Sequence, residues 1–372
     1  MIHFFIGTKA QLIKMAPLMR ELSRRRVPFR YVDSGQHAEI TRKLRYALGL
    51  PEPCISLRDS EADITSMAGA ARWYLKHLAS TWFARRRLRE QIFPGGGVCL
   101  IHGDTLSTLL GLQLSRAAGL STVHVEAGLR SFKWFNPFPE ELIRIWCMHR
   151  ADLLFAPSQE AAQNLTTMNV RGKVVPVCGN TVVDSLRMVL NEEEPRDDLP
   201  KMPYVLATCH RLETITHRKR FADAIRAINE VSSKIDVEFV IHRPTKNYLR
   251  RFGLADQLNA NVTCRDMLDY PQFIGLLRHA CGVITDGGSI QEECGYLQMP
   301  CLVLRETTER SDGLGTTALL WDRSSNVVEQ FTAQLRKGHR PATVSSDQPS
   351  PTAEIADKLL AYASSQIQRA GN

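Results

Sequence analysis

The sequence predicts an α/β protein with two Rossmann-like domains that face a central cleft. Short apolar segments alternate with helical stretches in both halves of the chain, and an acidic stretch with two internal prolines separates the halves. Alternation of this kind is typical of parallel sheets covered by helices. The 372 residues are enough for two domains that each bury a core.

The N-terminal half supplies the first predicted domain, residues 1–190. Its predicted helices are 10–25, 105–119 and 139–151, and its predicted strands are 2–7, 28–34, 97–103, 121–127, 152–158 and 174–179. Strands joined by helices run parallel to one another, so we expect a doubly wound sheet.

A predicted linker at 191–203 precedes the second domain, residues 204–351, where the alternation restarts. We expect helices at about 217–233, 245–253, 271–280 and 289–297, and strands at 204–210, 237–243, 262–267, 281–288 and 300–305. A final helix at 352–368 could pack on either domain. Ligands of such folds bind beyond the carboxyl ends of the strands, which makes polar residues at these positions the candidate site.

Composition excludes several classes of protein. Hydrophobic residues make up 44% and charged residues 23%, a balance typical of globular rather than disordered chains. No apolar run approaches the roughly 20 residues of a membrane span, and the N-terminal segment lacks the basic region and cleavage site of a secretory signal. The nine cysteines show no C-x-x-C spacing, so we expect no metal site and a reducing, cytoplasmic compartment.

The net charge of +8 favours an anionic partner, and an anionic substrate, nucleic acid or an acidic membrane would each fit it. Part of the charge lies in the segment 73–92, where arginines follow Trp73, Tyr74, Trp82 and Phe83. For this segment we favour a core helix that ends in a solvated basic turn over a membrane or partner surface.

The sharpest anion-binding signal is the segment VITDGGSIQEE, residues 283–293. Gly287 and Gly288 allow a tight turn after a strand, and Ser289 is placed to cap the helix that follows. Free N–H groups at such a helix start suit a diphosphate, and Glu293 one turn later could accept hydrogen bonds from ribose hydroxyls. An ordinary strand–turn–helix with a capping serine explains the pattern equally well.

Four acidic or imidazole side chains follow predicted strands or loops and converge on the same predicted cleft edge: Asp104, Glu126, Glu140 and His210. A charged group there is costly to bury unless it is paired or used. Each alone is more often a cap or a structural ion pair, but four together favour a catalytic role. Arg211, next to His210, could hold a phosphate.

The ordered motifs of the chain resemble those of the non-hydrolysing UDP-N-acetylglucosamine 2-epimerases. The motifs are GTKAQLIKMAPL, HGDT, HVEAGLRS, NPFPEELIR, GNTVVDSL, CHRLET, DGGSIQEE and LRETTERSDG, which span about residues 7 to 314. The resemblance implies the glycosyltransferase-B fold, with the final helix crossing back to the first domain. It also implies a UDP-sugar as partner rather than nucleic acid, and a homodimer.

The resemblance further implies the reaction, inversion at C2 of UDP-N-acetylglucosamine (UDP-GlcNAc) to give UDP-N-acetylmannosamine (UDP-ManNAc), without NAD or metal. UDP is eliminated to leave a 2-acetamidoglucal and is then added back, in a route to bacterial-type surface-polysaccharide precursors. By motif position, Asp104, Glu126 and Glu140 match the catalytic carboxylates and His210 the active-site histidine. The positions that match nucleotide or phosphate contacts are Lys14, Phe273, Glu293 and Arg310, with Lys9 in place of an arginine.

The chain departs from the family pattern at several positions. Where the family has G-T-R-P-E, D-S-G-G and H-R-R-E, this chain has Gly7-Thr8-Lys9-Ala10-Gln11, Asp286-Gly287-Gly288-Ser289 and His210-Arg211-Leu212-Glu213. A regulatory second-site pattern Q-H-x-Q becomes Gln36-His37-Ala38-Glu39, and the R-Q beyond it becomes Arg58-Asp59. Carboxylates at Glu39 and Asp59 would repel a second anionic substrate, so we expect a hyperbolic curve of rate against UDP-GlcNAc. A sigmoidal curve would contradict this.

Three functions remain open from the sequence. The first is an epimerase acting on UDP-GlcNAc or a close relative. The second is a glycosyltransferase or a hydrolysing epimerase of the same fold. The third is a non-catalytic nucleotide-sugar binding protein, which would have no need of three carboxylates and His210.

Overall fold

The computed structural model describes residues 1–57, 64, 67–83, 85–134, 139–191, 199–200, 203–308, 310–335, 343–344 and 347–371. Most of the predicted linker 191–203 lies outside these residues, and so do Arg58 and Asp59. The chain forms two compact units, one of residues 1–185 with 347–372 and one of residues 186–346.

The first unit is built on a seven-stranded parallel sheet in the order β3-β2-β1-β4-β5-β6-β7. Its strands are β1 (Ile2–Ile6), β2 (Phe29–Asp33), β3 (Ile55–Ser56), β4 (Val98–His102), β5 (Ser121–Val125), β6 (Leu153–Ala156) and β7 (Lys173–Pro176). Almost every residue of β1, β4, β5 and β6 is buried, as continuous apolar runs predict for parallel strands covered on both faces.

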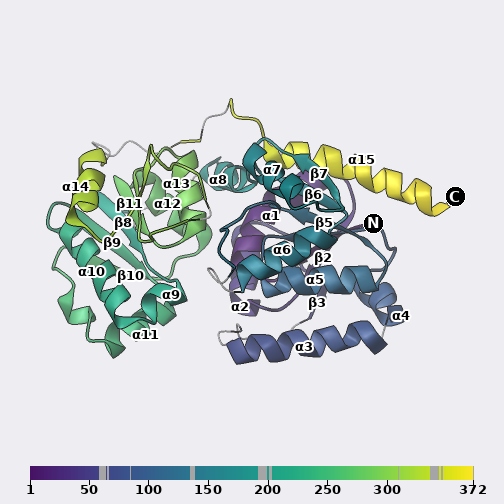
Figure 1. The fold of residues 1–372 in the computed structure, drawn as a ribbon, viewed down its shortest axis with the longest axis horizontal. Helices are drawn as coiled ribbons and strands as arrows, with labels where there is room; N and C mark the ends of the chain where they lie inside the picture. The colour runs from purple at the N-terminus through teal and green to yellow at the C-terminus, as the bar shows by residue number, and fades with distance from the viewer. Residues whose placement is uncertain are drawn as a thin grey trace. The chain divides into compact units, whose positions relative to one another are not determined.

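Helices cover both faces of this sheet (Figure 1). On one face α5 packs between α3 and α6, and on the other α1 packs between α2 and α15. The helices are α1 (Lys9–Arg24), α2 (Ala38–Ala47), α3 (Met67–Phe83), α4 (Arg85–Arg87), the π-helix η1 (Leu88–Ile92), α5 (Leu106–Ala117), α6 (Glu140–Arg150), α7 (Gln159–Thr167) and α15 (Pro351–Gly371). Helix α8 (Val182–Asn191) begins in the first unit and continues into the second.

The final helix, α15, belongs to the first unit. Asp357 pairs with Arg25 at the end of α1. The Glu354 carboxylate accepts a hydrogen bond of 2.8 Å from the Cys178 amide, and Asp184 accepts one of 2.9 Å from the Thr352 amide. These contacts attach the start of α15 to the β7–α8 region, far away in sequence.

The second unit repeats the plan with a six-stranded parallel sheet in the order β10-β9-β8-β11-β12-β13. Its strands are β8 (Tyr204–Thr208), β9 (Asp236–Ile241), β10 (Val262–Asp266), β11 (Gly282–Thr285), β12 (Cys301–Val303) and β13 (Ala318–Leu320). Its helices are α9 (Leu212–Ile215), α10 (Arg218–Ser232), α11 (Arg243–Arg251), the 3-10 helix η2 (Ala255–Gln257), α12 (Tyr270–His279), α13 (Gly288–Tyr296) and α14 (Ser325–Gln334).

The basic aromatic segment 73–92 forms α3, α4 and η1. Trp73 is buried in the core of the first unit, whereas Leu75 is 61% exposed. Arg85 and Arg86 are exposed, as expected for a solvated basic turn; the side chains of Trp82 and Phe83 lie outside the described part of the chain. None of the helices in the described residues combines the length and the hydropathy that a membrane span requires.

Each sheet has one point at which the strand order reverses. In the first unit it lies between β1 and β4, and in the second between β8 and β11. Loops that leave neighbouring strands in opposite directions open a crevice at such a point, where ligands of doubly wound sheets bind. The segments that follow these strands are Gly7–Thr8, Gly103–Thr105, Cys209–Arg211 and Asp286–Gly287, so the fold brings candidate site residues to both crevices.

Gly7 illustrates how closely the chain packs at the first of these points. A Cβ atom on Gly7 would lie 1.7 Å from Oγ of Ser34 and 2.2 Å from Oγ of Ser107. Those two hydroxyls hydrogen-bond to each other at 2.7 Å in a buried position. Only glycine fits between them without displacing the start of α1.

We therefore expect Gly7→Ala to lower the free energy of unfolding by about 1–3 kcal/mol, the usual cost of overpacking. Chemical denaturation of the whole protein measures this change. The matched comparison is Gly7→Ala in a Ser34→Gly background, where the added methyl group should cost less. Equal costs in both backgrounds would show that Ser34 does not enforce the glycine.

Candidate active site

Glu126 follows β5 at the carboxyl edge of the first sheet and is almost fully buried. The Lys14 ammonium and the Asn180 side-chain amide both donate to its Oε2 atom, and His102 Nε2 lies 3.9 Å from the same oxygen. Lys14 itself is buried inside α1. A buried carboxylate thus has its charge balanced and its oxygen hydrogen-bonded, which is the condition for keeping it there.

The backbone of Glu126 has a φ of 64°, in the left-handed region that residues other than glycine rarely adopt. The chain therefore bends sharply as it leaves β5. Strained backbone of this kind persists only where surrounding contacts hold it, and it gathers at functional sites.

Asp104 and α6 are joined through Arg144, a buried arginine. Its guanidinium donates to the Asp104 carboxylate and, at 2.9 Å, to Glu141 Oε2. Arg130 donates to the other oxygen of Glu141 at 2.6 Å. Burial alone would raise the pKa of Glu141, but the hydrogen bonds from Arg130 and the Ser131 amide, with the charge of Arg144, hold this pKa below its usual value.

Glu140 is the first residue of α6 and is half-buried beside this network. A carboxylate at a helix N-terminus is stabilised by the helix dipole. The structure thus places Asp104, Glu126 and Glu140 at the carboxyl edge of the first sheet, whereas His210, predicted to join them, follows β8 in the second unit. Lys9, the first residue of α1, is half-exposed at the same edge.

Gln11, where the family pattern has a glutamate, fastens two loops of this edge together. Its Oε1 accepts from the Gly7 and Thr8 amides at 2.9 and 3.2 Å. Its Nε2 donates to the His102 carbonyl at 2.8 Å and approaches the Thr108 hydroxyl at 2.9 Å. An amide supplies both the acceptor and the donors for these contacts, whereas an ionised carboxylate has no proton to donate.

In the second unit a buried carboxylate, Asp286, organises the loop that carries His210. It accepts from the amides of His210 at 3.0 and 3.1 Å and of Arg211 at 2.9 Å, and the Cys209 thiol lies 3.3 Å away. Burial, and then the nearby Asp286 charge, raise the pKa of the Cys209 thiol well above its usual value. Asp286 is fully buried and connects the ends of β8 and β11.

The imidazole of His210 is fixed from several sides. It stacks on the His242 ring with centroids 4.8 Å apart, and its Nδ1 lies 3.3 Å from the Thr208 hydroxyl. A Cβ atom on Gly287 would lie 3.0 Å from Cε1 of this ring. Gly287 is therefore needed for the close approach of the imidazole to the start of α13.

The predicted capping role of Ser289 is wrong. Helix α13 begins at Gly288 with Gly287 as its N-cap and without a side-chain capping hydrogen bond, so Ser289 lies inside the first turn. The turn starts earlier than expected because the Gly287 amide bonds the Thr285 hydroxyl at 3.0 Å. Without a side-chain cap, the first-turn amides point beyond the helix end, where an anion can accept their hydrogen bonds.

Arg310 lies beside α13, where its guanidinium is 3.3 Å from Glu292. Gln291 holds the segment that carries it, donating to the Arg310 and Asp312 carbonyls at 3.1 Å each and accepting from the Thr308 hydroxyl at 2.8 Å. These contacts hold Arg310 beside Gln291 and Glu292 of α13, the helix whose start is predicted to bind the diphosphate.

Glu293 lies within α13 and Phe273 within α12, and both are largely buried. Burial, followed by the neighbouring Glu293 carboxylate, raises the pKa of Tyr270 well above its usual value. Arg211, predicted near phosphate, has its guanidinium 3.2 Å from Glu213.

Sequence reasoning missed the residues that support the candidates: Arg144, Glu141 as its partner, Asn180, Gln291, His242, and Asp286 as the anchor of the His210 loop. Asp286 carried a usable signal, since it ends an apolar strand next to the turn already singled out. Glu141, Arg144, Asn180 and Gln291 lie inside the quoted motifs NPFPEELIR, GNTVVDSL and DGGSIQEE, which could have singled them out. His242 lies in none of the motifs.

A sequence model of the family described as UDP-N-acetylglucosamine 2-epimerase matches residues 20–351. The chain belongs to this family. A UDP-N-acetylglucosamine 2-epimerase of Methanocaldococcus jannaschii is 28% identical over 352 residues, which cover 90% of this chain and 92% of that protein. One of Bacillus subtilis is 30% identical over 339 residues, covering 88% and 85%.

Solved structures of the family confirm the predicted fold class. The UDP-GlcNAc 2-epimerase of M. jannaschii, solved in complex with UDP-GlcNAc and UDP, matches with a TM-score of 0.81 and 26% identity over 97% of this chain and 99% of that one. The Neisseria meningitidis enzyme bound to UDP-GlcNAc matches with a TM-score of 0.79 and 24% identity, covering 96% and 99%. Both units are therefore Rossmann-like domains of the glycosyltransferase-B type.

We expect Asp286→Asn to lower the free energy of unfolding by about 1–3 kcal/mol, because one of its two acceptor oxygens becomes an NH₂ group that faces backbone N–H donors. The matched control is Asp322→Asn, whose carboxylate also accepts from a backbone amide, that of Ser324 at 2.9 Å, but on the surface. That change should stay within about 0.5 kcal/mol. Urea denaturation measures both, and equal losses would refute the special role of Asp286.

Proposed function

We propose that the chain inverts C2 of UDP-GlcNAc, or of a close UDP-HexNAc relative, by non-hydrolysing elimination and re-addition of UDP. The observation that carries the proposal is the arrangement of Asp104, Glu126 and Glu140 at one sheet edge, in a chain aligned with 2-epimerases over most of its length. The enzyme would supply precursors of surface polysaccharides.

The chemistry divides between the two units. A base removes the C2 proton while the C1–O bond to UDP breaks, which leaves 2-acetamidoglucal and UDP. UDP then adds back at C1 while an acid delivers a proton to the opposite face of C2. We assign the proton transfers to Asp104, Glu126, Glu140 and His210, with Lys14 balancing the charge of Glu126.

The second unit would hold UDP. We assign the diphosphate to the first-turn amides of Gly288 and Ser289, beyond the Gly287 N-cap, and to Arg310, because amides at a helix N-terminus and a guanidinium both stabilise the departing anion. Glu293 would accept from the ribose, and Phe273 would contact the nucleotide. Lys9 and Arg211 supply further cations for the phosphates.

Two further features belong to this proposal. We place the enzyme in the cytoplasm, which agrees with nine free cysteines, six of them buried. We also propose a homodimer, for which the exposed Leu75 on α3 is a candidate contact. Light scattering on the purified protein measures the mass.

Incubation with UDP-GlcNAc and no acceptor tests the function. NMR should show UDP-ManNAc appearing until the two sugars reach equilibrium. A glycosyltransferase would leave UDP-GlcNAc unchanged under these conditions, and a hydrolysing enzyme would release free UDP and sugar. Either result would overturn the proposal.

The carboxylate assignments are tested by exchange of the C2 proton in heavy water. Asp104→Asn, Glu126→Gln and Glu140→Gln should each slow exchange by about 10²–10⁴-fold, the usual worth of general acid–base catalysis, and weaken UDP binding far less. Glu160→Gln on α7, an exposed carboxylate of the same unit, is the matched control and should exchange at the original rate.

Melting temperatures accompany these measurements. Glu126→Gln leaves the buried Lys14 ammonium without its carboxylate and is expected to lose stability as well. If Glu126→Gln unfolds, the exchange measurements on Asp104→Asn and Glu140→Gln still test the carboxylate assignments. Folded variants that exchange C2–H as fast as the original protein would remove the carboxylate concerned from the mechanism.

A further inference from the structure

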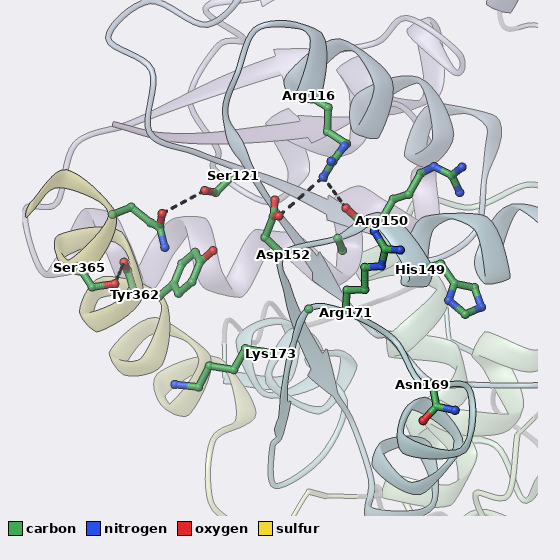
Figure 2. Close-up of a pocket in the computed structure, with 13 residues that line it drawn as sticks. Arg116, Ser121, His149, Arg150, Asp152, Asn169, Arg171, Lys173, Tyr362 and Ser365 are labelled. Atoms are coloured by element: carbon green, nitrogen blue, oxygen red, sulfur yellow. Dashed lines mark hydrogen bonds and ion pairs between the residues drawn. The ribbon is translucent and has the colours of Figure 1, made fainter. Parts of the chain in front are cut away.

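A basic pocket of about 1020 Å³ lies at the edge of the first sheet opposite the candidate active site. Its floor is formed where β5 and β7 begin, at Ser121 and Lys173, and where Asp152 precedes β6. The ends of α5 and α6 contribute Arg116 and Arg150 (Figure 2). The candidate catalytic groups lie at the other ends of these elements.

The lining is strongly cationic. Arg116, Arg150, Arg171 and Lys173 line the pocket with one carboxylate, Asp152, which lies 3.6 Å from Arg116. Figure 2 shows Arg116 directed toward Asp152, and it also donates to the Arg150 carbonyl at 2.7 Å. One of the four cations is thus balanced inside the pocket.

Stabilisation of helix ends, the usual reason for cations at such positions, accounts for only two of the four cations. Arg116 and Arg150 lie in the last turns of α5 and α6, where a cation stabilises the negative end of the helix dipole. Arg171 and Lys173 lie in no helix, and both are exposed. Among the described residues, the ion pairs of the chain include neither of them.

Backbone packing sets these two cations on either side of Gly172. A Cβ atom on Gly172 would lie 2.2 Å from the Ala151 carbonyl oxygen, so the chain lies tight against the end of α6. Arg171 and Lys173 thereby flank a fixed point at the pocket floor. Their placement depends on a close approach that only glycine allows.

Helix α15 forms the opposite wall, with Tyr362 and Gln366. In Figure 2 the Tyr362 side chain extends from α15 toward Asp152, and Lys173 extends toward α15 from the sheet side. The walls therefore border an open hollow, whose volume is close to the upper end of the size range of small-molecule sites. An aromatic ring and amide groups among the cations suit a compact polar ligand.

We propose that this pocket binds a small molecule carrying several phosphate groups. Guanidinium groups match phosphate oxygens with paired N–H donors, and three arginines and a lysine line this pocket from three separate segments. The site is distinct from the predicted UDP site, which is made by residues of the second unit together with Lys9 at the start of α1.

Calorimetry with inorganic tripolyphosphate, on the whole protein saturated with UDP, tests the proposal. Saturation fills the predicted diphosphate site, so the remaining binding reports the pocket. We expect one tripolyphosphate per chain. Arg171→Ala with Lys173→Ala should weaken this binding at least about tenfold, as expected from the loss of two charge-assisted contacts.

The matched control removes two exposed cations at the end of α11 in the second unit, Arg250→Ala with Arg251→Ala. It lowers the net charge equally and should leave tripolyphosphate binding unchanged. If the double variant of the pocket loses its melting transition, Lys173→Gln alone replaces it, with a smaller loss of affinity expected.

Three outcomes would overturn the proposal. The first is no tripolyphosphate binding to the UDP-saturated protein. The second is equal affinity in the pocket variant and the control, which would mean that the anion responds to net charge alone. The third is tighter binding of a poly-glutamate peptide than of tripolyphosphate, which would identify the hollow as a contact for acidic protein segments.

Discussion

The contact between Lys14 and Glu126 is the constraint on which the first unit depends. The two residues are 112 positions apart, one inside the first helix and one just after β5, and both are buried. Removing one partner of such a pair usually costs about 3–5 kcal/mol, since it leaves an unpaired charge in the interior. Helix α1 therefore has to lie over the end of β5. The same contact holds the left-handed turn at Glu126, whose carboxylate also fixes the side chain of Asn180.

The same solution recurs in the second unit with different chemistry. Asp286 is buried at the end of β11, but its charge is held by backbone amides of the β8 loop and not by a lysine. In both units a carboxylate at the carboxyl edge connects strands or helices that are distant in sequence. A carboxylate whose charge the fold must satisfy is placed accurately together with its neighbours. In the first unit that carboxylate, Glu126, is itself a candidate catalytic group, and in the second Asp286 holds the backbone of the candidate His210.

The elements of both sheets could be predicted from the sequence because parallel strands are nearly continuous apolar runs. β1, β4, β5 and β8 coincide with the expected segments to within about one or two residues, as do α1, α5 and α10. Short elements such as β3, β13 and α9 carry too few residues for a periodic pattern. The carboxylates were predictable as well, since a charge directly after a buried strand needs a reason to be there.

The partners of those carboxylates could not be predicted in the same way. Arg144 and Asn180 are ordinary polar residues in sequence, and their role arises from contacts across 40 and 54 residues. The prediction that Ser289 caps the helix failed for a local reason. The Gly287 amide bonds the Thr285 hydroxyl, and α13 begins at Gly288, two residues before the predicted start. Sequence patterns report which residues must be buried or must turn; they do not report which distant group satisfies a buried charge.

The polarity of the βα unit explains why two chemically different sites can occupy one domain. Every strand of the first sheet runs the same way, so all carboxyl ends gather at one edge and all amino ends at the other. Helices α5 and α6 consequently begin beside Asp104 and Glu140 and end at the basic pocket, where the Arg116 side chain bonds the Arg150 carbonyl. At their other ends Arg144 joins the same two segments through Asp104. The two helices are thus tied together at both ends by arginines, and they connect the two edges of the sheet as a single packed layer.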